Sequence, residues 1–208
     1  MLRRGEVYEN PANTIRAVIQ VGTWETNGER LVADLDVRRC GAGSALHMHP
    51  TIHERLTIVS GRVAVSVNDK TSIAEVGSTI EIAPGVPHRW WNAGIYQARV
   101  TIDIQPAARF EEYIRNLFGL AQDGKTDPSG MPHLLQLAVL SQDFSDVIRF
   151  VKPARFVPGS LFPAIAPIAR LFGYRGSYSK YLTRPPSQVL DHGVRSAENH
   201  HSELADSA

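Results

Sequence analysis

The stretch GAGSALHMHPTIHERLTIVSG, residues 41–61, decides the fold. Within it, His47 and His49 are separated by one residue, and residues i and i+2 of a β-strand face the same side. Two imidazoles on one face of a strand can reach the same point in space. Glu54 follows five positions after His49, which leaves the chain room to bend and bring a carboxylate to the pair. Two imidazoles and a carboxylate are typical of a metal site.

A second stretch, GSTIEIAPGVPHRWWN at residues 77–92, predicts one more ligand. Its APGVP core predicts a turn, because proline fixes φ and glycine permits positive φ. His88 follows this turn directly and begins a short aromatic strand. If this strand pairs beside the first stretch, His88 becomes a fourth ligand.

Together the two stretches resemble the two motifs of the cupin family. The first is similar to the family pattern G-x5-H-x-H-x4-E-x6-G, and the second to G-x5-P-x-G-x2-H-x3-N. Ala83 departs from the second pattern, where the family usually has proline, but Pro84 beside it keeps the turn stiff. The resemblance covers residues 12–106, and the 15 residues between the motifs are a length common in the family. The matching positions are Gly41, His47, His49, Glu54, Gly61, Gly77, Gly85, His88 and Asn92.

This resemblance implies a jelly-roll barrel that holds one divalent transition metal on His47, His49, Glu54 and His88. Three neutral imidazoles and one carboxylate give an M²⁺ site a net charge of about +1, and an octahedral arrangement leaves two positions open. The ligands do not select among Fe, Mn, Ni, Co, Cu and Zn. A core that kept these four side chains without a metal would be unstable, because each buried polar group needs a partner.

Composition is that of an ordinary globular protein of 208 residues, enough for one domain with an appendage. Lys and Arg number 22 against 21 Asp and Glu, a balance that argues against a nucleic-acid partner. The one cysteine, Cys40, cannot form an internal disulfide, which fits a reducing compartment. The N-terminus lacks the apolar segment of a signal peptide, and no run is long enough to span a membrane. We therefore expect a cytoplasmic protein.

Hydrophobic periodicity predicts antiparallel strands before residue 106. Residues 30–38 alternate, with Leu31 and Leu35 on one face and Asp34 and Asp36 on the other. Short strands separated by Gly and Pro turns favour a sandwich or barrel, from which the resemblance selects the cupin-type jelly roll. Residues 1–12 are expected to form an arm and Asn68-Asp69 a hairpin turn. The strands are expected near residues 14–22, 30–38, 63–67, 79–82 and 96–104.

After Gln105-Pro106 the period changes from two to 3.6, and the sequence predicts helices. The first carries the apolar stripe Phe110, Tyr113, Ile114, Leu117 and Phe118, and the second carries Leu137, Leu140, Phe144, Val147 and Ile148. A third is expected at residues 160–172, with a kink at Pro167 and its end at Gly173. The expected divisions are 1–106 for the barrel with its arm, 107–183 for a helical extension packed on the barrel or at a dimer interface, and 184–208 for a disordered polar tail.

Strand alternation separates the expected ligands from their neighbours. His53 and Arg55 point away from the Glu54 face, so His53 is not an expected ligand and Arg55 is expected in a salt bridge. Trp90 and Asn92 share the face of His88. Trp90 either walls the pocket or packs in the core, and Asn92 is expected to satisfy backbone groups of a turn.

Functions of different classes remain open at this point. The resemblance implies a metal-dependent cupin enzyme acting on a small organic molecule, with dioxygenase-like oxidoreductase chemistry leading and Glu54 as the catalytic candidate. One alternative is a zinc-type cyclase, isomerase or lyase, and another is a non-catalytic small-molecule-binding or sensor cupin. The sequence contains no helix-turn-helix and no basic stripe, so no nucleic-acid partner is expected, and a homodimer is the expected assembly.

Overall fold

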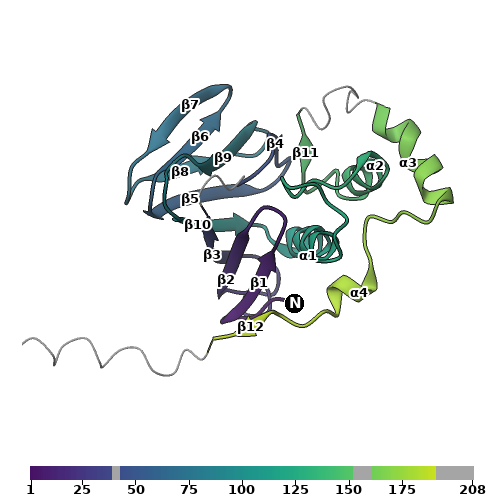
Figure 1. Cartoon of the computed structure of the whole chain (residues 1–208), viewed down its shortest axis with the longest axis horizontal. Helices are drawn as coiled ribbons and strands as arrows, with labels where there is room; N and C mark the ends of the chain where they lie inside the picture. Colours follow the sequence, from purple (N-terminus) through teal and green to yellow (C-terminus); the bar gives the residue numbers. More distant parts are fainter. Residues whose placement is uncertain (39–42, 152–160, 191–208) are drawn as a thin grey trace, which may run out of the picture.

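The computed structural model describes residues 1–38, 43–151 and 161–190. In that part of the chain two antiparallel β-sheets form a jelly roll, and helices lie along one side of it (Figure 1). The larger sheet has the order β12-β1-β2-β3-β10-β5-β8, with β1 (Glu6–Asn10), β2 (Ile15–Val21), β3 (Leu31–Val37), β5 (His53–Ser60), β8 (Thr79–Ile82), β10 (Ala98–Gln105) and β12 (Gln188–Val189). The smaller sheet has the order β11-β4-β9-β6-β7, with β4 (His47–Met48), β6 (Val63–Val67), β7 (Lys70–Ala74), β9 (His88–Asn92) and β11 (Arg149–Phe150).

The strand pattern of the sequence explains where the core lies. In β3 the side chains of Leu31, Ala33 and Leu35 are buried, as their alternation predicts. β6 and β7 are joined through Asn68 and Asp69, which have φ angles of 48° and 62°, the positive values that a two-residue hairpin turn requires. The mainly β fold with C-terminal helices is therefore confirmed.

Two strand predictions differ from the structure. The sequence predicts a strand from residue 96, but β10 begins at Ala98 and Tyr96 is 77% exposed. The reason is a turn, closed by the Asn92 side-chain amide, which donates to the Tyr96 carbonyl over 2.8 Å. The expected arm contains β1, which pairs with both β2 and β12. Part of the expected tail thus forms β12, whereas residues 191–208 lie outside the described part of the chain.

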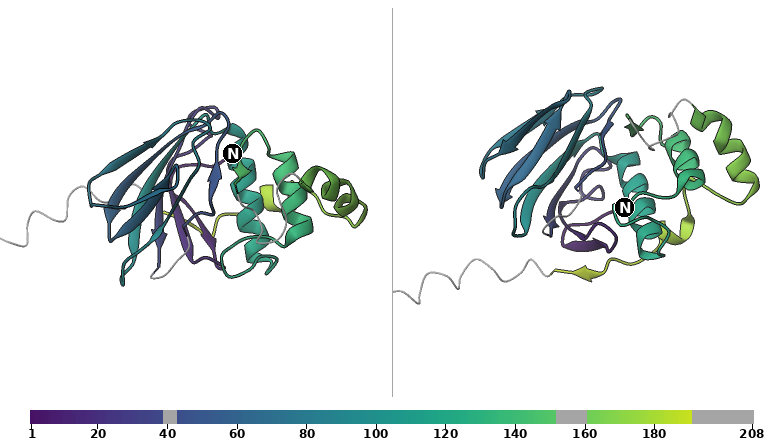
Figure 2. Two further views of the ribbon diagram at one scale, coloured as in Figure 1. Left: turned by 90° about the horizontal axis from the view of Figure 1, so that it is seen from above. Right: turned by 45° about the horizontal axis from the view of Figure 1, so that its top comes forward.

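The helices lie beyond the open side of the two sheets, with α1 nearest to the strands and α3 farthest from them (Figure 2). α2 ends earlier than its apolar stripe predicts, but Phe144, Val147 and Ile148 are buried in the turns that follow it. α3 continues through Pro167, and Gly173 follows its end with a φ of 85°. Helix and strand side chains share one apolar core. The bounds are α1 (Ala108–Gln122), α2 (Leu134–Asp143), α3 (Phe162–Leu171) and α4 (Ser179–Leu182).

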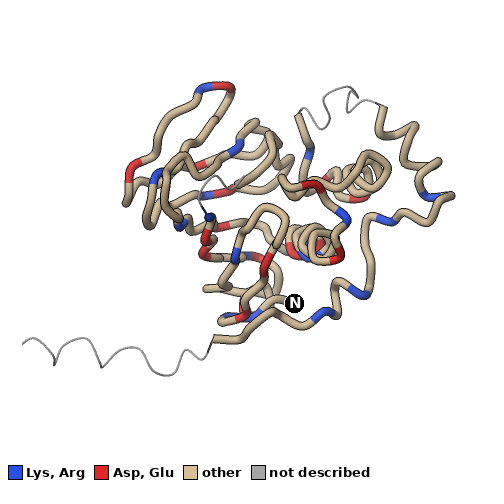
Figure 3. Tube along the Cα trace, in the orientation of Figure 1, with Lys and Arg blue, Asp and Glu red and all other residues tan. Residues whose placement is uncertain are grey.

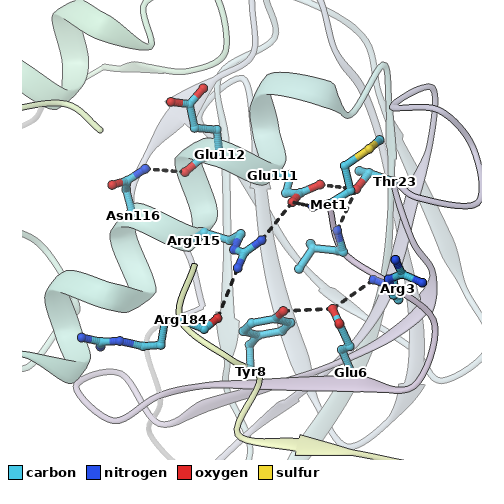
Figure 4. Close-up of polar contacts among 11 residues, drawn as sticks. Met1, Arg3, Glu6, Tyr8, Thr23, Glu111, Glu112, Arg115, Asn116 and Arg184 are labelled. Carbon is cyan, nitrogen blue, oxygen red and sulfur yellow. Dashed lines mark hydrogen bonds and ion pairs between the residues drawn. The ribbon is translucent and has the colours of Figure 1, made fainter. Parts of the chain in front are cut away.

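Polar contacts fix α1 against the chain on either side of it (Figure 4). The Thr23 hydroxyl donates to the Glu111 carboxylate, joining α1 to the turn after β2. Arg115 donates through Nη1 to Glu111 over 3.3 Å and through Nη2 to the Arg184 carbonyl over 3.2 Å. α1 is therefore held in one position relative to the larger sheet and to the segment that leads into β12.

Charged residues of both signs are spread along the chain, but the segment from α3 to residue 184 contains basic residues only (Figure 3). Three of these basic groups pair with acidic groups in α2 and directly after α1. Arg170 contacts Asp143 at 2.5 Å, and Lys180 and Arg184 contact Asp123 at 2.5 and 2.7 Å. These pairs help to dock the segment on α1 and α2. Among residues 1–38, 43–151 and 161–190, no helix is long and apolar enough to cross a membrane.

Candidate metal centre

Three strands and one loop bring the four predicted ligands together. His47 lies in β4 directly opposite His88 of β9, and His49 follows β4. Glu54 lies in β5 of the other sheet, so the cluster spans the space between the two sheets. One ligand atom from each of these four side chains lies within 4.8 Å of the others, and all four side chains are buried.

The spacing within the cluster suits a single cation. His47 Nε2 lies 3.2 Å from His49 Nε2, and Glu54 Oε2 lies 3.2 Å from His49 Nε2 and 2.9 Å from His88 Nε2. Ligand atoms bound at about 2.1 Å from one metal ion lie about 3.0 Å apart when they are at right angles. The observed separations are therefore those of neighbouring ligands around one ion.

Backbone carbonyls orient all three imidazoles. The Nδ1 atom of His47 donates to the Ala45 carbonyl over 2.7 Å, and that of His88 donates to the Val86 carbonyl over 2.9 Å. His49 Nδ1 donates to the Val147 carbonyl over 2.7 Å. Because a carbonyl oxygen only accepts, each Nδ1 carries the ring proton and each Nε2 points toward the centre. This is the arrangement that outer hydrogen bonds impose on metal-binding histidines.

The electrostatics of the cluster call for a positive charge. Burial, reinforced by the charges of His88 and His49, lowers the pKa of His47 to about 3, so this imidazole is neutral. Burial favours a higher pKa for Glu54, but the hydrogen bonds from His49 and His88 outweigh it and hold the Glu54 pKa below its usual range. Burial likewise opposes protonation of His88, yet the hydrogen bond and charge of Glu54 raise the His88 pKa. A buried carboxylate thus draws positive charge to Nε2 of its neighbour.

These residues fit a divalent metal ion. The neutral His47 ring carries its proton on Nδ1, so its Nε2 lone pair faces Nε2 of His49 at 3.2 Å, and Glu54 Oε2 lies 3.2 Å from that same His49 atom. A metal ion at the centre would accept electron pairs from these side chains. It would also balance the negative charge of Glu54, a role that a proton on His88 has in its absence. The buried group of His47, His49, Glu54 and His88 could therefore hold a metal ion.

The helical part of the chain also contributes to the cluster, which the sequence did not predict. β11 pairs with β4, and this pairing places the Val147 carbonyl beside His49. The Phe110 ring of α1 packs edge-on against the His49 ring, with 5.8 Å between their centroids. A backbone carbonyl leaves no trace in a sequence pattern, so Val147 could be found only in three dimensions.

The neighbouring residues take the positions that strand alternation predicts. His53 is exposed, and Arg55 makes a surface ion pair with Glu81 at 2.6 Å. The Trp90 side chain is buried and lines the same cavity as the ligands. The Asn92 amide donates to the carbonyls of Val37, Arg38 and Tyr96, satisfying backbone groups as expected. Gly41 and Cys40 lie outside the described residues.

A partly open cavity of about 150 Å³ extends from the cluster of His47, His49, Glu54 and His88, called the ligand cluster below. His47, His49 and Glu54 line one part of it, and most of the other lining side chains are apolar. Arg115 and Arg184 also line the cavity, but their guanidinium groups pair with Glu111 and Asp123. The larger sheet and α1 supply its apolar walls, among them Ile19, Leu31, Ala33, Phe110, Ile114 and Leu117.

Part of the chain matches a known protein family. The family described as Cupin domain matches residues 39–104. An RmlC-like cupin from Shewanella frigidimarina is 14% identical with a TM-score of 0.44, the match covering 53% of this chain and 92% of that chain. A predicted oxalate decarboxylase from Thermotoga maritima is 19% identical with a TM-score of 0.44, the match covering 50% of this chain and 98% of that chain. A sugar phosphate isomerase from Silicibacter pomeroyi is 12% identical with a TM-score of 0.40, the match covering 44% of this chain and 59% of that chain. No curated protein sequence matches the chain.

Proposed function

We propose that this protein, which belongs to the cupin superfamily through residues 39–104, is a metal-dependent enzyme that acts on a small organic molecule by dioxygenase-like chemistry. One observation carries the proposal. The Nε2 atoms of three oriented imidazoles and one carboxylate converge in the wall of a largely apolar cavity. A concave apolar site with a few convergent polar groups is the usual form of a small-molecule site.

The metal would be held by His47, His49 and His88 through Nε2 and by Glu54 through Oε2. A bound metal would supply Lewis acidity toward a carbonyl or enol oxygen, and iron, manganese, nickel or copper would add redox chemistry with O₂. Cobalt and zinc suit the same ligands, so metal identity is a matter for measurement.

The residues of the chain would bind and orient the substrate. The apolar walls exclude water and favour a ring or hydrocarbon over a sugar phosphate or a dicarboxylate, whose charges need paired donors. Phe110, in contact with His49, would hold the substrate against the ligand cluster. No described residue hydrogen bonds with Oε1 of Glu54, which leaves this atom available to accept a proton from a substrate hydroxyl. Glu54 is thus both the proposed fourth ligand and the proposed catalytic residue.

Oxygen consumption tests the reaction class. Protein reconstituted separately with each candidate metal would be given hydroxylated monocyclic aromatics and 1,3-dicarbonyl compounds under air. We expect O₂ uptake with at least one metal and compound, retained in His53→Ala and lost in His49→Ala. His53 is a matched control because it lies one residue from Glu54 but is exposed.

Other outcomes of the screen would support the alternatives. Conversion of a compound by the zinc form without O₂ uptake would contradict the dioxygenase and support a cyclase, isomerase or lyase. Ligand-induced stabilisation with no turnover under any metal would contradict the enzyme and support a binding or sensor protein.

We also propose a cytoplasmic homodimer, as expected from the sequence. A sedimentation experiment would test the assembly, for which twice the chain mass of 22.9 kDa is predicted. Cell fractionation would test the location.

A further inference from the structure

Tyr113 is a buried residue whose hydroxyl group makes no hydrogen bond with the described residues. Its side chain is 3% exposed and its ring lies near Phe110 and Phe144, with centroid separations of 6.2 and 5.7 Å. The residue lines the cavity that contains the ligand cluster. Among residues 1–38, 43–151 and 161–190, no group hydrogen bonds with Tyr113 Oη.

Other tyrosines around the same helix behave differently. The Tyr8 hydroxyl donates to Glu6 over 2.9 Å, and the Tyr181 hydroxyl donates to Asp123 over 2.9 Å. Tyr178 donates to Gln136 over 2.7 Å. These three hydroxyl groups are satisfied within the protein, as most buried polar groups are, whereas Tyr113 Oη makes no such bond.

The unbonded phenol has a chemical use if a molecule bound in the cavity supplies the partner. A hydroxyl group in the lining of an apolar cavity keeps its capacity to hydrogen bond with such a molecule, which phenylalanine would lack. Burial raises the pKa of the Tyr113 phenol, so the group stays neutral and can both donate and accept. A largely apolar cavity lined by this phenol would favour a ligand that is apolar in its body and polar where it meets Tyr113.

The size of the cavity limits the ligand. Apolar protein cavities of about 150 Å³ bind benzene, and the volume here is about 150 Å³. The lining is aromatic and aliphatic around Tyr113, and α1 carries both Tyr113 and Phe110, the residue that contacts His49. A single small ring could therefore lie between the ligand cluster and α1.

We propose that Tyr113 Oη is the group that recognises the substrate, and that the substrate is a benzene-sized ring carrying a hydroxyl or carbonyl group that hydrogen bonds with it. The statement that this ligand is a substrate rests on the proposed function. The binding preference itself does not depend on it.

Calorimetric titration with phenol and toluene tests this assignment. The two probes have nearly the same shape, so the ratio of their dissociation constants isolates the hydroxyl group. We expect Tyr113→Phe to weaken phenol binding about three- to tenfold, while toluene binding stays within about twofold. Tyr8→Phe is the control, because Tyr8 lines the same cavity but its hydroxyl is already bonded to Glu6. This variant should leave the ratio unchanged.

The melting temperature without ligand tests whether the Tyr113 hydroxyl has a structural role instead, because loss of a structural hydroxyl would lower it. Tyr113→Phe should melt no lower than the wild type, because it removes no bond within the protein. A lower melting temperature, an unchanged phenol-to-toluene ratio, or failure of both probes to bind would each overturn the proposal. Metal content of the same samples separates the two proposals. If the protein takes up no metal but still distinguishes phenol from toluene through Tyr113, the result would contradict the proposed function and leave the role of Tyr113 intact.

Discussion

Replacing Gly119 with alanine would test how closely α4 packs on α1. A Cβ atom at Gly119 would lie 2.4 Å from both Cγ and Cδ1 of Tyr181, and 2.9 Å from its Cβ. These atoms are near the Tyr181 backbone, and the side chain is 2% exposed with its hydroxyl bonded to Asp123, so the ring cannot swing away. In an open helix the same change stabilises by about 1 kcal/mol. Overpacking costs about 1–3 kcal/mol, and here the upper half of that range applies.

We therefore expect Gly119→Ala to lower the free energy of unfolding by about 1–2 kcal/mol. Urea denaturation followed by circular dichroism would measure the change from the transition midpoint at constant m. The control is the same substitution made in Tyr181→Ala protein, where the clash is absent and alanine should stabilise the helix. The reasoning would be refuted if Gly119→Ala were as stable as the wild type, or if its effect had the same sign in both backgrounds.

Two further substitutions test other parts of the structure. Phe110→Leu should lower the free energy of unfolding by only about 1 kcal/mol, because the side-chain volume changes little. The wider space beside His49 should let p-cresol bind more tightly than it binds the wild type. An unchanged p-cresol affinity, measured by calorimetry, would count against Phe110 as a cavity wall. Arg30→Met removes the two hydrogen bonds, of 2.9 and 2.7 Å, that Arg30 donates to Asp103. Burial opposes ionisation of Asp103, but Arg30 outweighs burial and lowers the Asp103 pKa. The stability that the ion pair contributes is therefore present above the pKa of Asp103 in the unfolded state and is lost as pH falls below about 4. Urea denaturation of Arg30→Met should show a loss of about 1 kcal/mol in the free energy of unfolding at pH 7, a value limited by the exposure of Arg30. This loss should become smaller toward pH 3, and a loss that does not depend on pH would contradict the ion pair.

Much of the fold and the ligand cluster could be predicted because both depend on local patterns. Strand alternation has a period of two, so the faces of β3 and the side of the chain to which His47 and His49 point follow from spacing alone. His53 and Arg55 could be assigned to the outer face for the same reason. The motif spacing that carries the cupin resemblance supplied the pairing of His88 with the first stretch, which alternation cannot give.

Other features depend on contacts between distant segments. The Val147 carbonyl that orients His49 is contributed by backbone, which has no sequence signature. Helical periodicity places Tyr113 on the apolar face of α1, but it cannot show that the hydroxyl lacks a partner. Gln188 and Val189 have no strand-like alternation around them, and their pairing with β1 arises from tertiary contact.

The measurement that tests the four-ligand site most directly is the metal content of untagged protein by elemental mass spectrometry. The samples would be the wild type, a His47→Ala, His49→Ala double variant and the exposed-site control His53→Ala, each after reconstitution and desalting. We predict about one divalent transition-metal ion per chain in the wild type and in His53→Ala, and none in the double variant. Wild-type protein that retains no metal after exposure to each of the six candidate ions, or a double variant that binds as much as the wild type, would contradict the site.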